Sequence, residues 1–155
     1  MIARSIAISA SGAVMLAAST QVAAEPVRFA SDVFIERFMP ALGGRTTRVL
    51  ERAEHLRPGD NVIFVVNWTA AHGREFVLTN IMPQTVTFQR SANSDQDVSV
   101  DGGRTWGRID DMRVRESDGG LRMATPEDVT HLRWRVPPAL AARGSGQITY
   151  RGIVR

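Results

Sequence analysis

The stretch Asn61-Val62-Ile63-Phe64-Val65-Val66-Asn67 decides the fold class. Successive side chains of a β-strand point to opposite faces, so Val62, Phe64 and Val66 share one face. Ile63 and Val65 share the other face, which is equally apolar. The segment therefore predicts a strand that is buried on both sides in the middle of a sheet.

Two later segments alternate in the same way. Thr130 to Val136 places Leu132, Trp134 and Val136 on one face, and we expect that face to be buried. The intervening residues, expected to face water, are His131, Arg133 and Arg135. After the turn Gly144-Ser145-Gly146, Ile148 and Tyr150 alternate with Thr149 and Arg151, which predicts the closing strand.

Glycine and proline recur at short intervals between the remaining apolar runs, which favours short strands joined by turns. Because strands and helices do not alternate, a parallel sheet is not expected, and two packed antiparallel sheets bury both sets of apolar faces. Helices of one or two turns fit only Thr125 to Asp128 and Pro138 to Arg143. The sequence predicts an all-β domain, an immunoglobulin-like antiparallel β-sandwich of about eight strands spanning residues 25–155. The further strands are expected at Phe76 to Thr79, Thr85 to Phe88 and Met112 to Arg115, and in a hairpin of Val33 to Phe38 and Arg45 to Leu50 around Gly43-Gly44.

The first residues differ in character from the rest of the chain. Arg4 precedes an uncharged apolar run from Ile6 to Ala18, and the small residues Ala23 and Ala24 follow. This order is typical of a secretory signal peptide, and the run is too short and too interrupted for a membrane-spanning helix. We predict a signal peptide at residues 1–24, cleavage before Glu25, and a periplasmic, cell-surface or secreted location.

The composition argues against several kinds of site. The chain has no cysteine, so disulfides, cysteine nucleophiles and cysteine-ligated zinc are excluded. The three histidines, His55, His72 and His131, lack the spacing of metal ligands. All 19 basic residues are arginines, but the net charge is only +3, which does not favour nucleic-acid binding.

One segment carries a family resemblance. Pro58-Gly59-Asp60 precedes the strand Val62 to Val66, and Phe76 to Asn80 and Met82-Pro83 follow. In this pattern the chain resembles a bacterial conserved repeat domain, catalogued as domain of unknown function eleven. Met82 stands where that family usually has leucine. The resemblance implies an immunoglobulin-like module of surface or secreted proteins and brings no catalytic residues.

A second motif is Ser99-Val100-Asp101-Gly102-Gly103-Arg104-Thr105-Trp106, which is similar to the Asp-box of sialidases and other propeller proteins. An aspartate can accept backbone N–H bonds across a turn whose glycines take positive φ, while a tryptophan covers it. We interpret the motif as a structural hairpin turn. A sialidase would need several such boxes in a longer chain.

Other groupings of polar residues have a structural and a functional interpretation. His131 with Asp128 and either Ser145 or Ser117 could form a hydrolase triad, although no nucleophile-elbow motif is present. The only tyrosine, Tyr150, fits the core better than a nucleophile. The aspartates that suggest a calcium loop, but are more typical of turns, are Asp95, Asp97, Asp101, Asp110 and Asp111. The arginines that could form an anion-binding stripe, or pair with acids across strands, are Arg113, Arg115, Arg133 and Arg135.

These patterns predict a non-enzymatic exported envelope or secreted module. We expect no catalytic, cofactor-binding or metal-binding residues, and a partner that is another protein or an envelope polymer. The alternative is a glycan-directed protein, either a carbohydrate-binding module or a relative of glycosidases, which only the Asp-box suggests.

Overall fold

The computed structural model describes residues 27–92 and 95–155, so the predicted signal peptide at residues 1–24 lies outside the described residues. The described part is mostly strand, and all of its strand pairs are antiparallel. The helical segments are short: η1 (Ile109–Asp111), η2 (Pro126–Asp128) and α1 (Pro138–Ala141). None of them is long and apolar enough to cross a membrane. The predicted all-β class is confirmed, as are the two expected helical positions at η2 and α1.

The larger sheet has five strands in the order β2-β1-β3-β10-β5. Both Val62 and Ile63 of β3 are buried, as the decisive stretch predicts for a central strand. The last strand, expected to close the fold, lies inside the sheet between β3 and β5. The strands of this sheet are β1 (Arg28–Pro40), β2 (Thr46–Arg52), β3 (Asn61–Thr69), β5 (Val86–Ser91) and β10 (Ser145–Val154).

The smaller sheet has three strands in the order β4-β9-β6. Its bounds are β4 (Phe76–Ile81), β6 (Gln96–Ser99) and β9 (His131–Val136). In β9, Leu132, Trp134 and Val136 are buried, while His131, Arg133 and Arg135 reach the surface. This confirms the predicted alternation, and it places one side of the sheet against the core.

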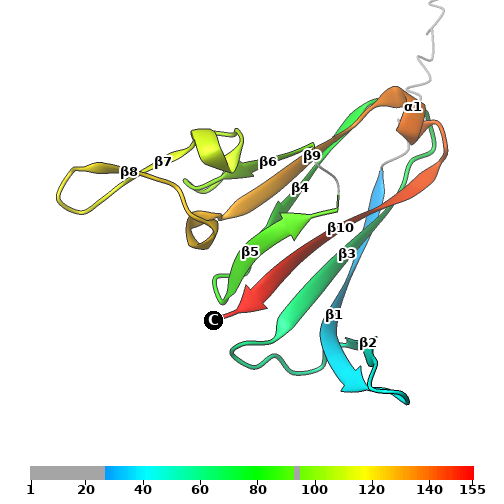
Figure 1. The fold of residues 1–155 in the computed structure, drawn as a ribbon. Helices are drawn as coiled ribbons and strands as arrows, with labels where there is room; N and C mark the ends of the chain where they lie inside the picture. The colour runs from blue at the N-terminus through cyan, green and yellow to red at the C-terminus, as the bar shows by residue number, and fades with distance from the viewer. Residues whose placement is uncertain (1–26, 93–94) are drawn as a thin grey trace, which may run out of the picture.

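Buried side chains from both sheets form one hydrophobic cluster. The rings of Phe64 and Tyr150 stack within the larger sheet, with centroids 4.6 Å apart and an interplanar angle of 5°. Trp134 of the smaller sheet lies 5.5 Å from the Tyr150 ring. The two sheets therefore meet through aromatic contacts, and in Figure 1 they converge towards α1.

Two hairpins project from this body (Figure 1). One consists of β7 (Arg113–Arg115) and β8 (Leu121–Met123), which form a separate two-stranded sheet. The other consists of β1 and β2, because the pairing of β1 with β3 ends at Glu36 whereas its pairing with β2 continues to Pro40. The described residues thus contain ten strands rather than about eight, since β6, with four residues, and β8, with three, are too short to show a reliable two-residue pattern.

Candidate functional site

The Asp-box segment forms a closed turn after β6. Val98 and Gly107 exchange backbone hydrogen bonds of 2.8 and 3.1 Å, so the chain returns to the strand it has just left. Gly102 and Gly103 have φ values of 77° and 87°, a region that side-chain-bearing residues rarely adopt. The glycine pair therefore permits the reversal, as the sequence predicts.

Asp101 holds this turn together. Its Oδ1 accepts hydrogen bonds from the Ser99 hydroxyl at 2.8 Å and from the backbone N–H groups of Arg104 and Thr105 at 3.0 and 2.9 Å. Its Oδ2 accepts a bond of 2.7 Å from the Thr105 hydroxyl. Ser99, which is fully buried, also accepts the Gly103 N–H at 2.8 Å. Both carboxylate oxygens are thus used inside the turn.

These hydrogen bonds also fix the charge state of Asp101. The Thr105 hydroxyl contributes most, followed by the Thr105 N–H and the Ser99 hydroxyl, and together they hold the pKa of Asp101 well below its usual range. A carboxylate in this state is a poor proton donor at neutral pH. The arrangement suits a turn clamp rather than a general acid.

Trp106 ends the turn and lies over the outer side of β9. Its indole Nε1 donates a 2.9 Å hydrogen bond to the Gly103 carbonyl. The Arg133 guanidinium sits 4.4 Å from the centre of the ring, a cation–π distance, and also pairs with Asp97 at 2.7 Å. The His131 ring meets the indole edge-on at 6.2 Å. The Asp-box thus anchors a small aromatic and polar cluster on the smaller sheet.

The aspartates considered for calcium do not gather into a site. Asp101 clamps the turn and Asp97 pairs with Arg133, while Asp110 and Asp111 lie in η1. In residues 27–92 and 95–155, no three His, Asp or Glu side chains are grouped so that they could hold a metal ion.

The residues considered for a hydrolase triad are engaged separately. The Nδ1 of His131 lies 3.0 Å from the Thr130 hydroxyl. Asp128 accepts two bonds, of 2.6 and 2.7 Å, from the Arg122 guanidinium, which more than any other contact lowers its pKa. Ser145 begins β10, and Ser117 lies in the turn between β7 and β8. The structure therefore does not assemble the triad.

Tyr150 lies in the core, where the alternation of β10 placed it. The ring is fully buried, and its hydroxyl accepts a hydrogen bond from the Asn80 amide. Burial raises its pKa to about 12, so the phenol stays protonated and non-nucleophilic at neutral pH.

The arginine stripe is divided by its acidic partners. Arg133 pairs with Asp97 at 2.7 Å, and Arg135 pairs with Glu75 at 2.8 Å. Arg113 and Arg115 belong to β7, which is not part of the sheet that carries β9. Pairing with acids, one of the two sequence interpretations, accounts for both arginines of β9: Asp97 belongs to the neighbouring strand β6, and Glu75 directly precedes β4.

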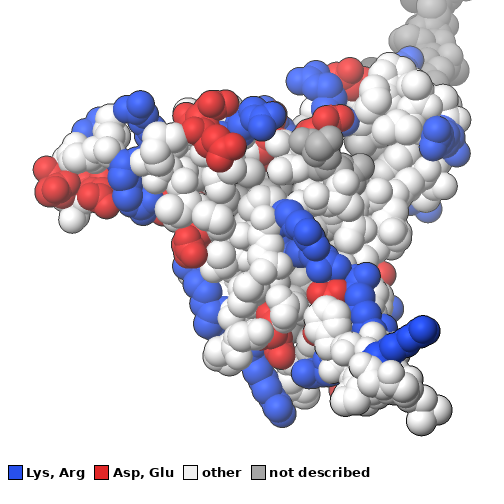
Figure 2. All heavy atoms as spheres, viewed as in Figure 1, with Lys and Arg blue, Asp and Glu red and all other residues white. Residues whose placement is uncertain are grey.

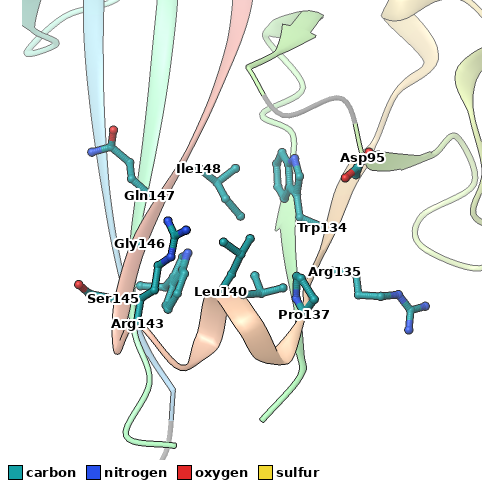
Figure 3. Close-up of a pocket in the computed structure, with 12 residues that line it drawn as sticks. Asp95, Trp134, Arg135, Pro137, Leu140, Arg143, Ser145, Gly146, Gln147 and Ile148 are labelled. Atoms are coloured by element: carbon teal, nitrogen blue, oxygen red, sulfur yellow. The ribbon is translucent and has the colours of Figure 1, made fainter. Parts of the chain in front are cut away.

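A cleft of about 270 Å³ opens between the sheets beside α1. Its apolar lining includes Trp134, Leu140 and Ile148, which point into the space between α1, β9 and β10, whereas Arg135 points away from it (Figure 3). Asp95 is the one carboxylate among its described lining residues. Most glycoside hydrolases use a facing pair of carboxyl groups, and the described lining of this cleft offers a single one.

The exposed surface of the β1–β2 hairpin was not predicted from the sequence. Phe38, Met39 and Leu42 are all exposed there, although an apolar run next to Gly43-Gly44 suggests burial. One feature of the sequence does set this segment apart: no acidic residue occurs between Arg37 and Leu50. In Figure 2 the end of this hairpin is largely white with blue arginines beside it.

In comparisons with known proteins, no family model, no curated protein and no solved structure matches this chain.

Proposed function

We propose that this chain is a non-catalytic module of the bacterial envelope, exported and then retained there or secreted, that acts by binding through its projecting hairpins and sheet edges. The observation that carries the proposal is that the polar side chains considered for a site are used to hold the fold together. Three residues were considered for a site: Asp101 as a calcium ligand, Asp128 in a triad and Arg133 in an anion-binding stripe. Each is instead engaged in holding a turn or a pair of strands. Large apolar side chains are exposed on both projecting hairpins, and others are exposed elsewhere, at Phe29, Leu56, Val77, Ile81 and Leu140.

The proposed fold is an immunoglobulin-like β-sandwich. Its support is that two antiparallel sheets contribute to one core, with Trp134 on one side and Phe64 and Tyr150 on the other. Such sandwiches bind partners through edge strands and through loops at their ends, because the rigid core positions both.

The glycan-directed alternative has only the Asp-box in its favour. That turn forms, but its aspartate and serine are occupied by hydrogen bonds within the turn. Its Trp106 is covered on one face by Arg133, which reduces the aromatic surface left for stacking on a sugar.

The proposed export rests on the order of the charged start, apolar run and small-residue end at residues 1–24. The test begins with expression of the whole chain in a bacterium and mass measurement of each cell fraction. We expect a processed chain that begins at Glu25 in the envelope or medium. A full-length chain confined to the cytoplasm would contradict the proposal.

The absence of catalysis is tested on the same purified protein. It is incubated with a panel of chromogenic glycosides and esters beside an Asp101→Asn variant. We expect no turnover by either protein, while cross-linking in envelope fractions captures a binding partner. Turnover that the substitution abolishes would instead establish an enzyme.

A further inference from the structure

The β1–β2 hairpin extends beyond the sheet from which it starts. From Arg37 onwards, β1 pairs only with β2, and the backbone N–H of Ala41 donates a 2.7 Å bond to the Arg45 carbonyl across the turn. Gly43 and Gly44, with φ values of 78° and 72°, complete the reversal. We call residues 38–50 the hairpin tip.

The hairpin tip exposes apolar side chains on all of its sides. Leu42 at the turn is 99% exposed, Phe38 is 61% exposed and Met39 is 51% exposed. Because Phe38 and Met39 are consecutive in a strand, they point to opposite faces. Leu50, 46% exposed, lies on the same face as Phe38. The tip is therefore a convex apolar projection rather than a flat patch.

The charged residues of the tip itself are all basic. The tip carries Arg45 and Arg48 and no acidic residue. Arg48 shares the buried carboxylate of Glu36 with Arg151, which contacts it through two bonds of 3.0 and 2.9 Å. One carboxylate thus serves two guanidiniums, and Arg45 has no acidic partner among the described residues.

The base of the hairpin is held by ion pairs. Arg37 contacts Glu51 at 2.9 Å, and Arg52 contacts Asp32 at 3.0 Å. These pairs join β1 and β2 below the tip, so the tip is presented on a supported stalk.

The other projecting hairpin provides a contrast within the same molecule. The β7–β8 hairpin also exposes apolar side chains, Leu121 and Met123, but its turn carries Glu116 and Asp118. Figure 2 shows acidic side chains, in red, at the far end of that hairpin, opposite the β1–β2 tip. The strands of that hairpin also carry Arg113, Arg115 and Arg122, so its charge is mixed, whereas the charged residues of the β1–β2 tip are all basic. An anionic surface would therefore favour the β1–β2 tip over the acidic turn of the other hairpin.

We infer that the hairpin tip inserts into the interface of an anionic phospholipid bilayer, with Phe38, Met39 and Leu42 at the level of the acyl chains and Arg45 among the phosphates. A convex tip with exposed apolar side chains at its turn and on both faces suits a fluid phase, which surrounds it, better than a protein surface that contacts one face. Exposed aromatic and aliphatic groups beside arginines are the combination that interfacial binding uses. The inference rests on the proposed envelope location and adds the lipid surface to which the module docks.

The chain lacks cysteine, so one introduced thiol can carry a probe at a chosen position. Leu42→Cys labels the tip and Ser117→Cys labels the acidic turn between β7 and β8; both side chains are exposed, so neither change disturbs the core. Each processed protein, labelled with an environment-sensitive fluorophore, is titrated with vesicles of phosphatidylethanolamine containing phosphatidylglycerol, and separately with phosphatidylcholine vesicles. We expect a blue shift only for the tip label and only with the anionic vesicles. Equal shifts at both positions, or none at the tip, would overturn the inference.

Matched substitutions test which side chains bind. Phe38→Ser with Leu42→Ser should weaken partitioning into the anionic vesicles by roughly tenfold or more. The reason is that two apolar side chains, exposed in the free protein and buried in the bilayer interface, are lost. Leu121→Ser with Met123→Ser makes the same kind of change on the other hairpin and should leave partitioning unchanged. Arg45→Glu should lower it by roughly tenfold through charge reversal, with the loss diminishing in high salt. Equal losses in the two double variants would refute a specific role for the tip.

The two proposals can fail separately. If the chain is not exported but the tip label still responds to anionic vesicles, the envelope location is wrong and the lipid-binding site stands. If the chain is exported and the tip label responds to a captured protein but not to lipid, the binding module stands and the bilayer inference is wrong.

Discussion

Raising the pH above 10 should destabilise this protein through a single side chain, Tyr150. It is the only tyrosine, and the chain contains neither lysine nor cysteine, so no other kind of side chain titrates between pH 10 and 12. Burial raises the pKa of Tyr150 from 10.0 to about 12 in the folded protein. Tyr150→Phe removes the titrating hydroxyl and keeps the ring.

The direction of the change in the free energy of unfolding follows from proton binding. Between pH 10 and 12 the unfolded chain has lost the phenol proton while the folded chain keeps it, so deprotonation favours unfolding as the pH rises. The stabilisation is complete below pH 10 and is lost as the pH rises through about 12. A difference of about two pKa units corresponds to a loss of roughly 2–3 kcal/mol in the free energy of unfolding.

Urea denaturation monitored by tryptophan fluorescence, repeated at intervals from pH 9 to pH 12, measures this loss. Near neutral pH the Tyr150→Phe variant should be less stable by about 1 kcal/mol, because the Asn80 amide loses its acceptor. Its free energy of unfolding should then stay flat across the window in which the parent protein declines. If the two proteins lose stability in parallel, or the phenol of the folded protein titrates near pH 10, the buried position of Tyr150 is refuted.

Three further predictions, the first with a matched comparison, concern other parts of the structure. Trp134→Ala should cost about 3–5 kcal/mol in urea denaturation, since a buried indole between the sheets is removed; Trp106→Ala, at a half-buried position, should cost clearly less. Asp101→Asn should speed amide hydrogen exchange at Arg104 and Thr105 while leaving β3 unchanged, and uniform acceleration would contradict a local clamp. Because the pKa of Asp101 in the folded protein lies below its ordinary value of 3.8, its stabilising contribution is present above that pH and is lost as the pH falls further, a dependence the variant should lack. Gly146→Ala should destabilise the protein by about 1–3 kcal/mol, because an added Cβ overlaps the Trp68 indole, and a neutral effect would show that this packing is wrong.

The sequence was most informative where one strand carries its own pattern. The faces of β3 and β9 followed from alternation, because burial on one or both sides requires it. The four residues of β6 and the three of β8 are too few to carry such a pattern. The position of β10 inside the larger sheet depends on pairing with β3 and β5, which no local signal encodes.

The same difference between local and long-range contacts applies to the candidate functional residues. The Asp-box was predictable because the hydrogen bonds of its Asp101 and Ser99 side chains join residues at most four positions apart. The contact of Glu36 with Arg151 spans 115 positions and could not be anticipated from spacing. The exposure of Phe38 and Leu42 depends on where the pairing of β1 with β3 ends, which is a tertiary property.

The contact between Trp134 and Tyr150 is the most direct test of the two-sheet core on which the projecting hairpins depend. Nuclear Overhauser effects measured on the processed protein should connect the Tyr150 ring with Phe64, 4.6 Å away in the same sheet, and with the Trp134 indole, 5.5 Å away in the other sheet. Cross-peaks to Phe64 without any to Trp134 would mean that the sheets do not face each other, and would contradict the architecture described here.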